Sequence, residues 1–218
     1  MLTYFNITVT VEWLTFFAAL LLLDKKTGIW QLFIPLMFLV LCTETIGWYM
    51  HVKQQIFDNA LPFNILLILS NLFFIWFLCK AVLLQPIQQL LKSILVAFAV
   101  FAVVNLIFFQ GPWRYNSFSE SAADIILVII CCYFLFTIVK SNEHFNLVSF
   151  DYFWLATGLL FYCLGSALLY QFSYLLRDYY EQTKIDIGTY VNYTLNLILH
   201  TCLIIAFICR RKTTRLLQ

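Results

Sequence analysis

The side chains of this chain that could do chemistry lie inside segments that are otherwise apolar. Carboxyl, amide and imidazole groups are costly in hydrocarbon, so polar residues within such segments are candidates for binding or for proton transfer. The candidates for one ligand-binding polar cavity are Glu44, Asn64, Asn71, Asn105, Asp124, Asn192, Asn196 and His200. Glu12, near the start of the first apolar segment, is expected at the level of the lipid headgroups.

The spacing of the amides predicts two stripes on helix faces. Asn192, Asn196 and His200 stand at positions i, i+4 and i+8, and Asn64 and Asn71 stand seven residues apart. Such stripes should face the interior of a bundle, where Glu44 would meet amide donors or the imidazole of His200. Simple hydrogen bonding between helices is the alternative role for the amides.

Motifs for catalysis or metal binding do not occur in the sequence. It has no H-E-x-x-H or G-x-S-x-G motif, no paired aspartates at fixed spacing and only three histidines. The seven cysteines all fall in predicted helical segments and form no C-x-x-C pair. We therefore expect no catalytic residue, no metal site, no cofactor and no disulfide.

Seven apolar segments must position these residues. A transmembrane helix needs about 20 mostly apolar residues to cross ~30 Å of hydrocarbon. Such segments cover approximately residues 8–23, 29–50, 61–79, 91–109, 121–139, 150–175 and 188–209. With 63% hydrophobic and 11% charged residues, the composition is far from that of a soluble protein. The sequence predicts an all-α polytopic membrane protein, a single seven-helix transmembrane domain over residues 1–218.

The distribution of basic residues predicts how this bundle is oriented. Nine of the thirteen Lys and Arg residues fall at one set of segment ends, including the cluster Arg210, Arg211 and Lys212. By the positive-inside rule the C-terminus is cytoplasmic and the N-terminus is outside. The candidate residues then lie mostly in the outer half of the membrane. A net charge of +2 spread through the loops argues against nucleic acid as a partner.

Three local features predict helix geometry. Pro35, one turn into the second segment, should kink that helix. Gly158 and Gly165, seven residues apart, should let another helix approach the sixth segment closely. Pro86 should turn the amphipathic segment 81–92 at the membrane surface.

The order of several motifs resembles a known family. In the second segment an acidic residue precedes Gly and Tyr, an Asn opens an aromatic-rich third segment, and the sixth segment combines aromatic residues with glycines. The residues are Glu44, Gly47, Tyr49, Asn64, Phe73, Phe74, Trp76, the run 115–119, Phe153, Trp154, Gly158, Phe161, Tyr162 and Gly165. They resemble uncharacterised seven-helix membrane proteins of Bacteroidota, often encoded near sensor histidine kinases. The resemblance implies a bacterial inner-membrane location and a signalling neighbourhood, and no catalytic residues.

These observations favour one function class and leave two others open. The favoured one is a sensory or accessory protein whose outward-facing polar cavity binds a small ligand and signals to a membrane or cytoplasmic protein. The first alternative is a small-molecule transporter, which would need polar residues on both sides of a midplane site. The second is an intramembrane lipid-modifying enzyme, with Glu44, Asp124 or His200 as acid or base. The oligomeric state is not predicted.

Overall fold

All of the regular secondary structure described by this computed structural model is helical. The structure describes residues 5–53, 60–81, 85–140 and 146–216. The α-helices are α1 (Phe5–Leu22), α2 (Phe33–Lys53), α3 (Ala60–Ala81), α4 (Gln85–Val104), α5 (Ser117–Lys140), α6 (Asp151–Gln171), α7 (Ser173–Thr183) and α8 (Ile187–Leu216). Short 3₁₀ helices, η1 (Lys25–Leu32) and η3 (Leu147–Ser149), and a π-helical turn, η2 (Asn105–Phe109), connect them. The predicted all-α class is confirmed.

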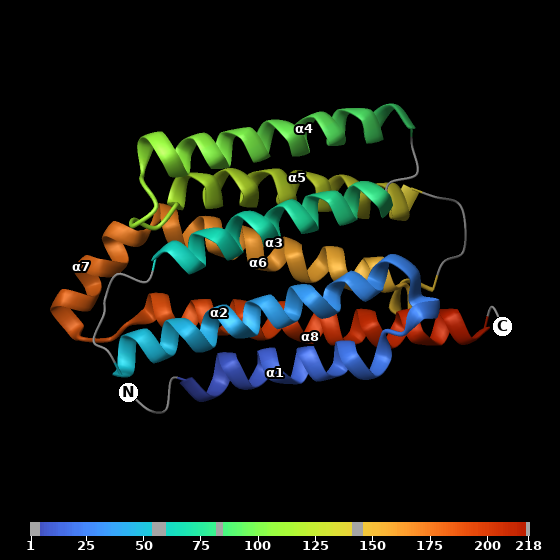
Figure 1. Cartoon of the computed structure of the whole chain (residues 1–218), viewed down its shortest axis with the longest axis horizontal. Helices are drawn as coiled ribbons and strands as arrows, with labels where there is room; N and C mark the ends of the chain where they lie inside the picture. The colour runs from blue at the N-terminus through green and yellow to red at the C-terminus, as the bar shows by residue number, and fades with distance from the viewer. Residues whose placement is uncertain (1–4, 54–59, 82–84, 141–145, 217–218) are drawn as a thin grey trace.

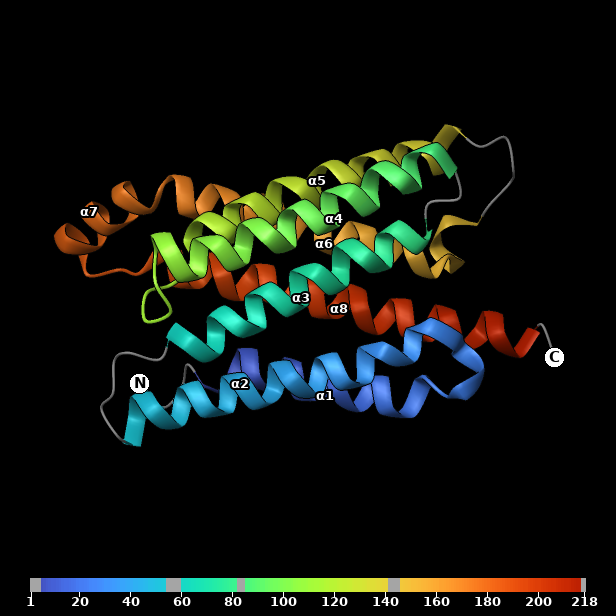
Figure 2. The same ribbon diagram turned by 45° about the horizontal axis from the view of Figure 1, so that its top comes forward.

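Helices α1–α6 and α8 run side by side, whereas α7 lies across one end of the bundle (Figures 1 and 2). The contacts between neighbours close a ring in the order α1, α2, α3, α5, α6 and α8, in which α8 packs back against α1. Helix α4 packs on the outside of this ring, against α3 and α5. We call the two ends of the bundle the α7 end and the basic end, where α8 finishes among Arg210–Arg215.

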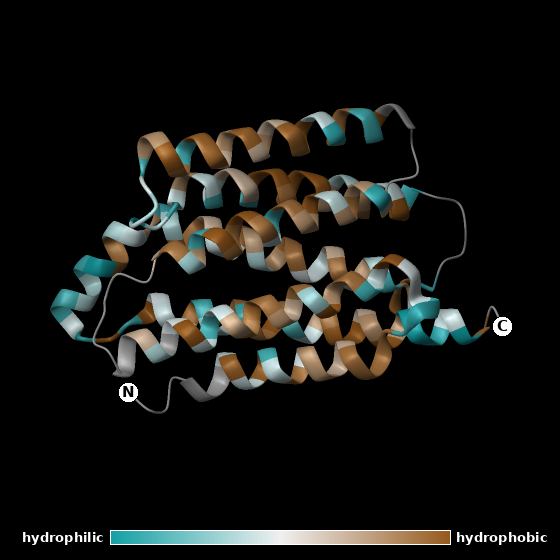
Figure 3. Ribbon diagram, viewed as in Figure 1, coloured by the Kyte–Doolittle hydropathy of each residue, from teal (hydrophilic) through white to brown (hydrophobic). Residues whose placement is uncertain are grey.

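Among the described residues, six helical segments are long and apolar enough to cross a membrane. They are Lys25–Gly47, Ala60–Ala81, Ile87–Phe109, Ser117–Lys140, Asp151–Gln171 and Ile187–Leu216. Helix α1 contributes a shorter apolar helix, Thr8–Leu22. Figure 3 shows hydrophobic residues along these helices and hydrophilic ones on α7 and on the last turns of α8. Many large apolar side chains, such as Phe108, Phe109 and Val139, face outward from the bundle. The chain is a multi-pass helical membrane protein.

Two predictions about helix geometry were wrong, one on the length of a helix and one on a kink. The segment 150–175 is not one helix, because α6 ends at Gln171 and Phe172 leaves helical geometry before α7 begins. The charged residues Arg177, Asp178 and Glu181 make α7 too polar to extend into hydrocarbon. Pro35 does not kink a helix, since α2 begins at Phe33 and a proline in the first turn removes no helical hydrogen bond.

The amphipathic segment 81–92 also differs from the prediction. Helix α4 begins at Gln85 and runs through Pro86, which stands at its second position, where proline is compatible with a helix. The surface turn predicted around Pro86 is therefore the first turn of a long helix. Residues 82–84 of this segment lie outside the described residues.

The close approach predicted at Gly158 and Gly165 is confirmed. Both glycines face α8, where a Cβ at Gly158 would lie 2.6 Å from Cys202 Cβ and a Cβ at Gly165 would lie 2.4 Å from Leu195 Cδ2. Any larger residue would therefore push α6 and α8 apart, unless the neighbouring side chain moves.

Gly158→Ala should destabilise the protein more than Gly165→Ala. At Gly158 the added methyl group meets a Cβ, which cannot move without its backbone, and the expected loss is about 1–3 kcal/mol. At Gly165 it meets the end of the Leu195 side chain, which can rotate away. Thermal unfolding in detergent, followed by circular dichroism, measures both variants, and equal losses would contradict this difference.

A cluster of buried aromatic rings fills the bundle toward its basic end. Trp30, Phe33, Phe77 and Phe207 are fully buried. The ring centroid of Phe77 lies 4.9 Å from that of Phe33 and 5.0 Å from that of Trp30, and Phe33 lies 5.3 Å from Phe207. These four residues come from η1, α2, α3 and α8, so the cluster joins four separate elements. We call it the aromatic plug.

Beyond the aromatic plug, Arg210 joins three elements at the basic end. Its Nη1 lies 3.4 Å from Asp151 Oδ2 at the start of α6, and its Nη2 donates to the backbone oxygen of Thr27 in η1 at 3.2 Å. The Asp151 side chain is buried, whereas that of Arg210 is 27% exposed. The last turns of α8 are therefore tied to α6 and to the connection between α1 and α2.

Candidate functional site

A large cavity of about 1870 Å³ lies inside the helix ring. Its walls come from α1, α2, α3, α5, α6, α7 and α8. Arg177, Tyr180, Lys184 and Asp186 line its rim and are exposed, so the cavity opens at the α7 end. Toward the basic end, apolar side chains form its floor, next to the aromatic plug. These floor residues are Leu36, Met37, Phe74, Leu127, Leu159 and Leu203.

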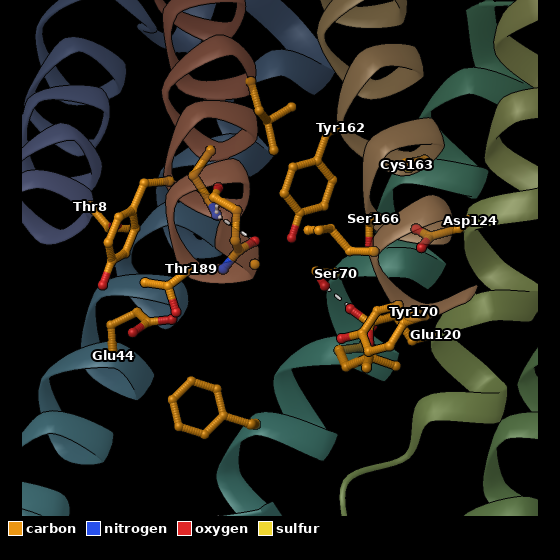
Figure 4. Close-up of a pocket in the computed structure, with 18 of the residues that line it drawn as sticks. Thr8, Glu44, Ser70, Glu120, Asp124, Tyr162, Cys163, Ser166, Tyr170 and Thr189 are labelled. Carbon is orange, nitrogen blue, oxygen red and sulfur yellow. Dashed lines mark hydrogen bonds between the residues drawn. The ribbon is translucent and has the colours of Figure 1, made fainter. Parts of the chain in front are cut away.

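Two pairs of carboxyl groups line opposite walls of the cavity. Glu12 on α1 and Glu44 on α2 form one pair, close enough to act on each other electrostatically. Glu120 and Asp124 form the other, one helical turn apart on α5. Figure 4 shows Glu44 on one side, Glu120 and Asp124 on the other, and Tyr162 between them.

The buried carboxyl groups are incompletely satisfied. The exposed fractions are 4% for Glu12 and 2% for Asp124. Glu12 Oε2 and Asp124 Oδ2 have no hydrogen-bond partner in the described part of the chain. Ser166 and Cys163 of α6 lie beside Asp124 (Figure 4). A buried oxygen without a partner is costly, which makes both groups candidates for contact with a ligand.

Two tyrosines organise the wall around Glu120. Tyr115 Oη donates to Glu120 Oε2 at 2.5 Å, and Tyr170 Oη donates to Tyr115 Oη at 3.1 Å. The two rings stack with their centroids 6.2 Å apart. Desolvation and the adjacent Glu120 carboxylate raise the pKa of the Tyr115 hydroxyl, which therefore remains a hydrogen-bond donor.

The predicted stripe on α8 lies along the cavity wall. Asn192, Asn196 and His200 all line the cavity, and Asn196 Nδ2 donates to the backbone oxygen of Asn192 at 2.9 Å. His200 is buried, and its Nδ1 lies 3.0 Å from Thr15 Oγ1 on α1. The Thr15 hydroxyl also lies 2.8 Å from Val11 O, and the tautomer of His200 sets which group donates in the His200–Thr15 contact.

Of the eight predicted cavity residues, six line the cavity and two do not. Glu44, Asn71, Asp124 and the three residues of the α8 stripe line it. Asn64 and Asn105 instead hold the connection between η2 and α5. Asn64 Nδ2 donates to the backbone oxygens of Pro112 and Arg114 at 3.1 and 2.8 Å.

Further hydrogen bonds to Asn116 and Ser119 hold the same connection. Asn64 Oδ1 accepts from Asn116 N at 2.8 Å, and Asn105 Nδ2 donates to Asn116 Oδ1 and, at 3.1 Å, to Ser119 Oγ. The prediction that Asn64 and Asn105 line the cavity was wrong, because the sequence alone does not show which backbone groups of an irregular connection need buried amides as partners. By fixing this connection, the two amides position Tyr115 at the cavity wall.

Asn64→Ala should therefore lower stability, whereas Asn71→Ala should not. Removing the Asn64 amide leaves two backbone oxygens and one backbone N–H without their partner, at an expected cost of about 1–3 kcal/mol. Asn71 is half-buried and faces the cavity, so its loss should cost less than about 0.5 kcal/mol. Thermal unfolding in detergent compares the two, and a similar loss in both would contradict the structural role of Asn64.

Sequence reasoning missed two of the four carboxyl groups. Glu12 was expected among the headgroups, but α1 turns it toward the cavity, where it is buried. Glu120 was not singled out. Its spacing of four residues from Asp124 was a usable signal, because residues at i and i+4 share a helix face. No sequence pattern links Glu12 with Glu44, since their contact depends on how α1 packs on α2.

No group of three or more His, Cys, Asp or Glu side chains suited to a metal ion occurs among the described residues. No protein-family model, curated protein or solved structure matches this chain. The resemblance to the membrane proteins of Bacteroidota therefore stays a prediction.

Proposed function

We propose that this protein is a sensory or accessory membrane protein whose outward-facing cavity binds a small polar ligand. Ligand binding would shift a helix and so act on a membrane or cytoplasmic signalling protein. One observation carries the proposal: the cavity opens at the α7 end and is closed toward the basic end by its apolar floor, which lies next to the aromatic plug. A closed floor suits a binding site that reports on one side of the membrane.

Helix α8 supplies the route for such a shift. It runs without a break from Ile187 to Leu216. Its first half lines the cavity with Asn192, Asn196 and His200, Phe207 belongs to the aromatic plug, and Arg210 contacts α6 and η1. A displacement at the cavity wall would reach the basic end because a continuous helix moves as a rigid element.

The proposed setting is a bacterial inner membrane with seven helices spanning it. Helix α1 would be the seventh span, because it lies beside α2 and α8 along the same axis (Figure 1). We place the basic end in the cytoplasm, since Lys25, Lys26, Lys80 and Lys140 lie there with the basic end of α8. The N-terminus would then be outside. The resemblance to the family of Bacteroidota supports a signalling neighbourhood.

Hydrogen–deuterium exchange in lipid nanodiscs tests this coupling. A panel of small amines, carboxylic acids, sugars and alcohols is added, and exchange is followed at the cavity and at the last turns of α8. At least one solute should slow exchange at the cavity and change it near Arg210. Glu44→Gln and Asn196→Leu should abolish both changes while the protein stays inserted. Asp178→Asn, which changes an exposed carboxyl group on α7 that does not line the cavity, is the matched control.

Two outcomes would contradict the proposal. Unchanged responses in both cavity variants would show that the cavity does not receive the signal. Accumulation of the binding solute inside sealed proteoliposomes would identify a transporter.

A further inference from the structure

Acidic side chains outnumber Lys and Arg side chains along the described lining of the cavity. The two walls hold four carboxyl groups. The only Lys and Arg residues among its described lining are Arg177 and Lys184, which stand at the exposed rim. Arg177 is paired with Glu181 at 3.3 Å, and Lys184 Nζ lies over the ring of Tyr180, 5.8 Å from its centroid. The described lining therefore offers the carboxyl groups deeper in the cavity no Lys or Arg side chain as a partner.

Two of these carboxyl groups have an oxygen without a hydrogen-bond partner among the described residues. Glu12 Oε2 and Asp124 Oδ2 belong to side chains more than nine-tenths buried, and both residues line the cavity from opposite walls. A carboxylate in a low-dielectric interior is stabilised by a cation that also donates hydrogen bonds. An ammonium group offers both, because it carries a positive charge and several N–H donors.

Aromatic rings between the walls suit the same kind of ligand. Tyr162, Tyr170 and Tyr193 line the cavity, and Tyr162 stands between Glu44 on one side and Glu120 and Asp124 on the other (Figure 4). The faces of tyrosine rings attract ammonium groups and also pack against methylene chains. The cavity is also larger than the roughly 300–1,000 Å³ of a typical small-molecule site, so one ligand has room to reach both walls.

We propose that the ligand is a small organic cation with an amino group at each end, held between the Glu12–Glu44 pair and the Glu120–Asp124 pair. One ammonium group would bind at each pair, and the linking methylene groups would lie against the tyrosines. This inference rests on the proposed function, because it names the ligand class of the same cavity.

Calorimetric titration of the detergent-purified full chain tests it. The probes are linear diamines of four, five and six carbons, with the monoamines and the diols of the same lengths as matched controls. At least one diamine should bind tenfold or more tightly than its monoamine, and the diols should not bind. Glu12→Gln and Asp124→Asn should each weaken diamine binding at least tenfold, toward the affinity of the monoamine. Asp178→Asn, at an exposed carboxyl group of α7 outside the cavity lining, should leave it unchanged.

The outcomes separate this inference from the proposed function. Equal affinity for diamines and monoamines, or binding of diols or dicarboxylates in place of amines, would overturn the diamine assignment while leaving a ligand-binding cavity. Diamine binding that causes no change in exchange near Arg210 would support the assignment and contradict the signalling role. If Glu12→Gln fails to fold, Glu44→Gln on the same wall takes its place, since Glu44 is only half-buried.

Discussion

Phe77→Ala is expected to lower the free energy of unfolding by about 3–5 kcal/mol, the cost typical of removing a fully buried phenylalanine ring. Phe77 is fully buried, and its ring contacts those of Trp30 and Phe33 in the aromatic plug. The neighbouring rings belong to two separate elements, η1 and α2. Neither ring can fill the void left by Phe77 unless its element moves. Thermal unfolding in detergent gives the measurement.

The same substitution should also open the floor of the cavity. Removing the ring leaves a void between the cavity and the basic end, through which water and small solutes could pass. Proteoliposomes that carry Phe77→Ala should therefore release a trapped small solute faster than those with the unchanged protein. Phe136→Ala removes an exposed ring of α5 and is the matched control for both effects. If proteoliposomes with Phe77→Ala retain the solute as well as those with the unchanged protein, the aromatic plug is not what closes the cavity.

Arg210→Met should cost about 2–3 kcal/mol, because it leaves the buried Asp151 carboxylate without its cation. The loss should fall below that of a fully buried ion pair, since the Arg210 side chain is 27% exposed and partly screened by solvent. It should also free the last turns of α8, which Arg210 ties to Thr27 in η1. Faster hydrogen exchange in these turns is the second expected effect.

A double-mutant cycle separates the ion pair from the rest of the Arg210 contacts. Asp151→Asn combined with Arg210→Met should be more stable than the sum of the two single losses predicts, because no charge is left unpaired. Lys212→Met, which changes an exposed basic residue two positions away, is the control and should be near neutral. Strict additivity of the two single losses would contradict a direct interaction between Asp151 and Arg210.

Some features of the cavity could be read from residue spacing. The stripe of Asn192, Asn196 and His200 lies on one face because its spacing matches the helix repeat, and the same rule would have found Glu120 beside Asp124. Spacing within one helix fails where a polar residue serves an irregular connection. Asn64 was grouped with Asn71 on spacing alone, yet its partners lie about 50 residues further along the chain.

Composition and the lengths of the apolar segments were sufficient to establish a multi-pass helical membrane protein, since a chain in hydrocarbon must satisfy its backbone hydrogen bonds within helices. They also indicated polar residues within the membrane-spanning helices. Which of those residues meet depended on packing between distant helices. The pairing of Glu12 with Glu44, the closure of α8 against α1, and the aromatic plug beneath the cavity all join segments far apart in sequence. No local pattern encodes such contacts, because they arise only when the side chains of separate helices compete for the same interior space.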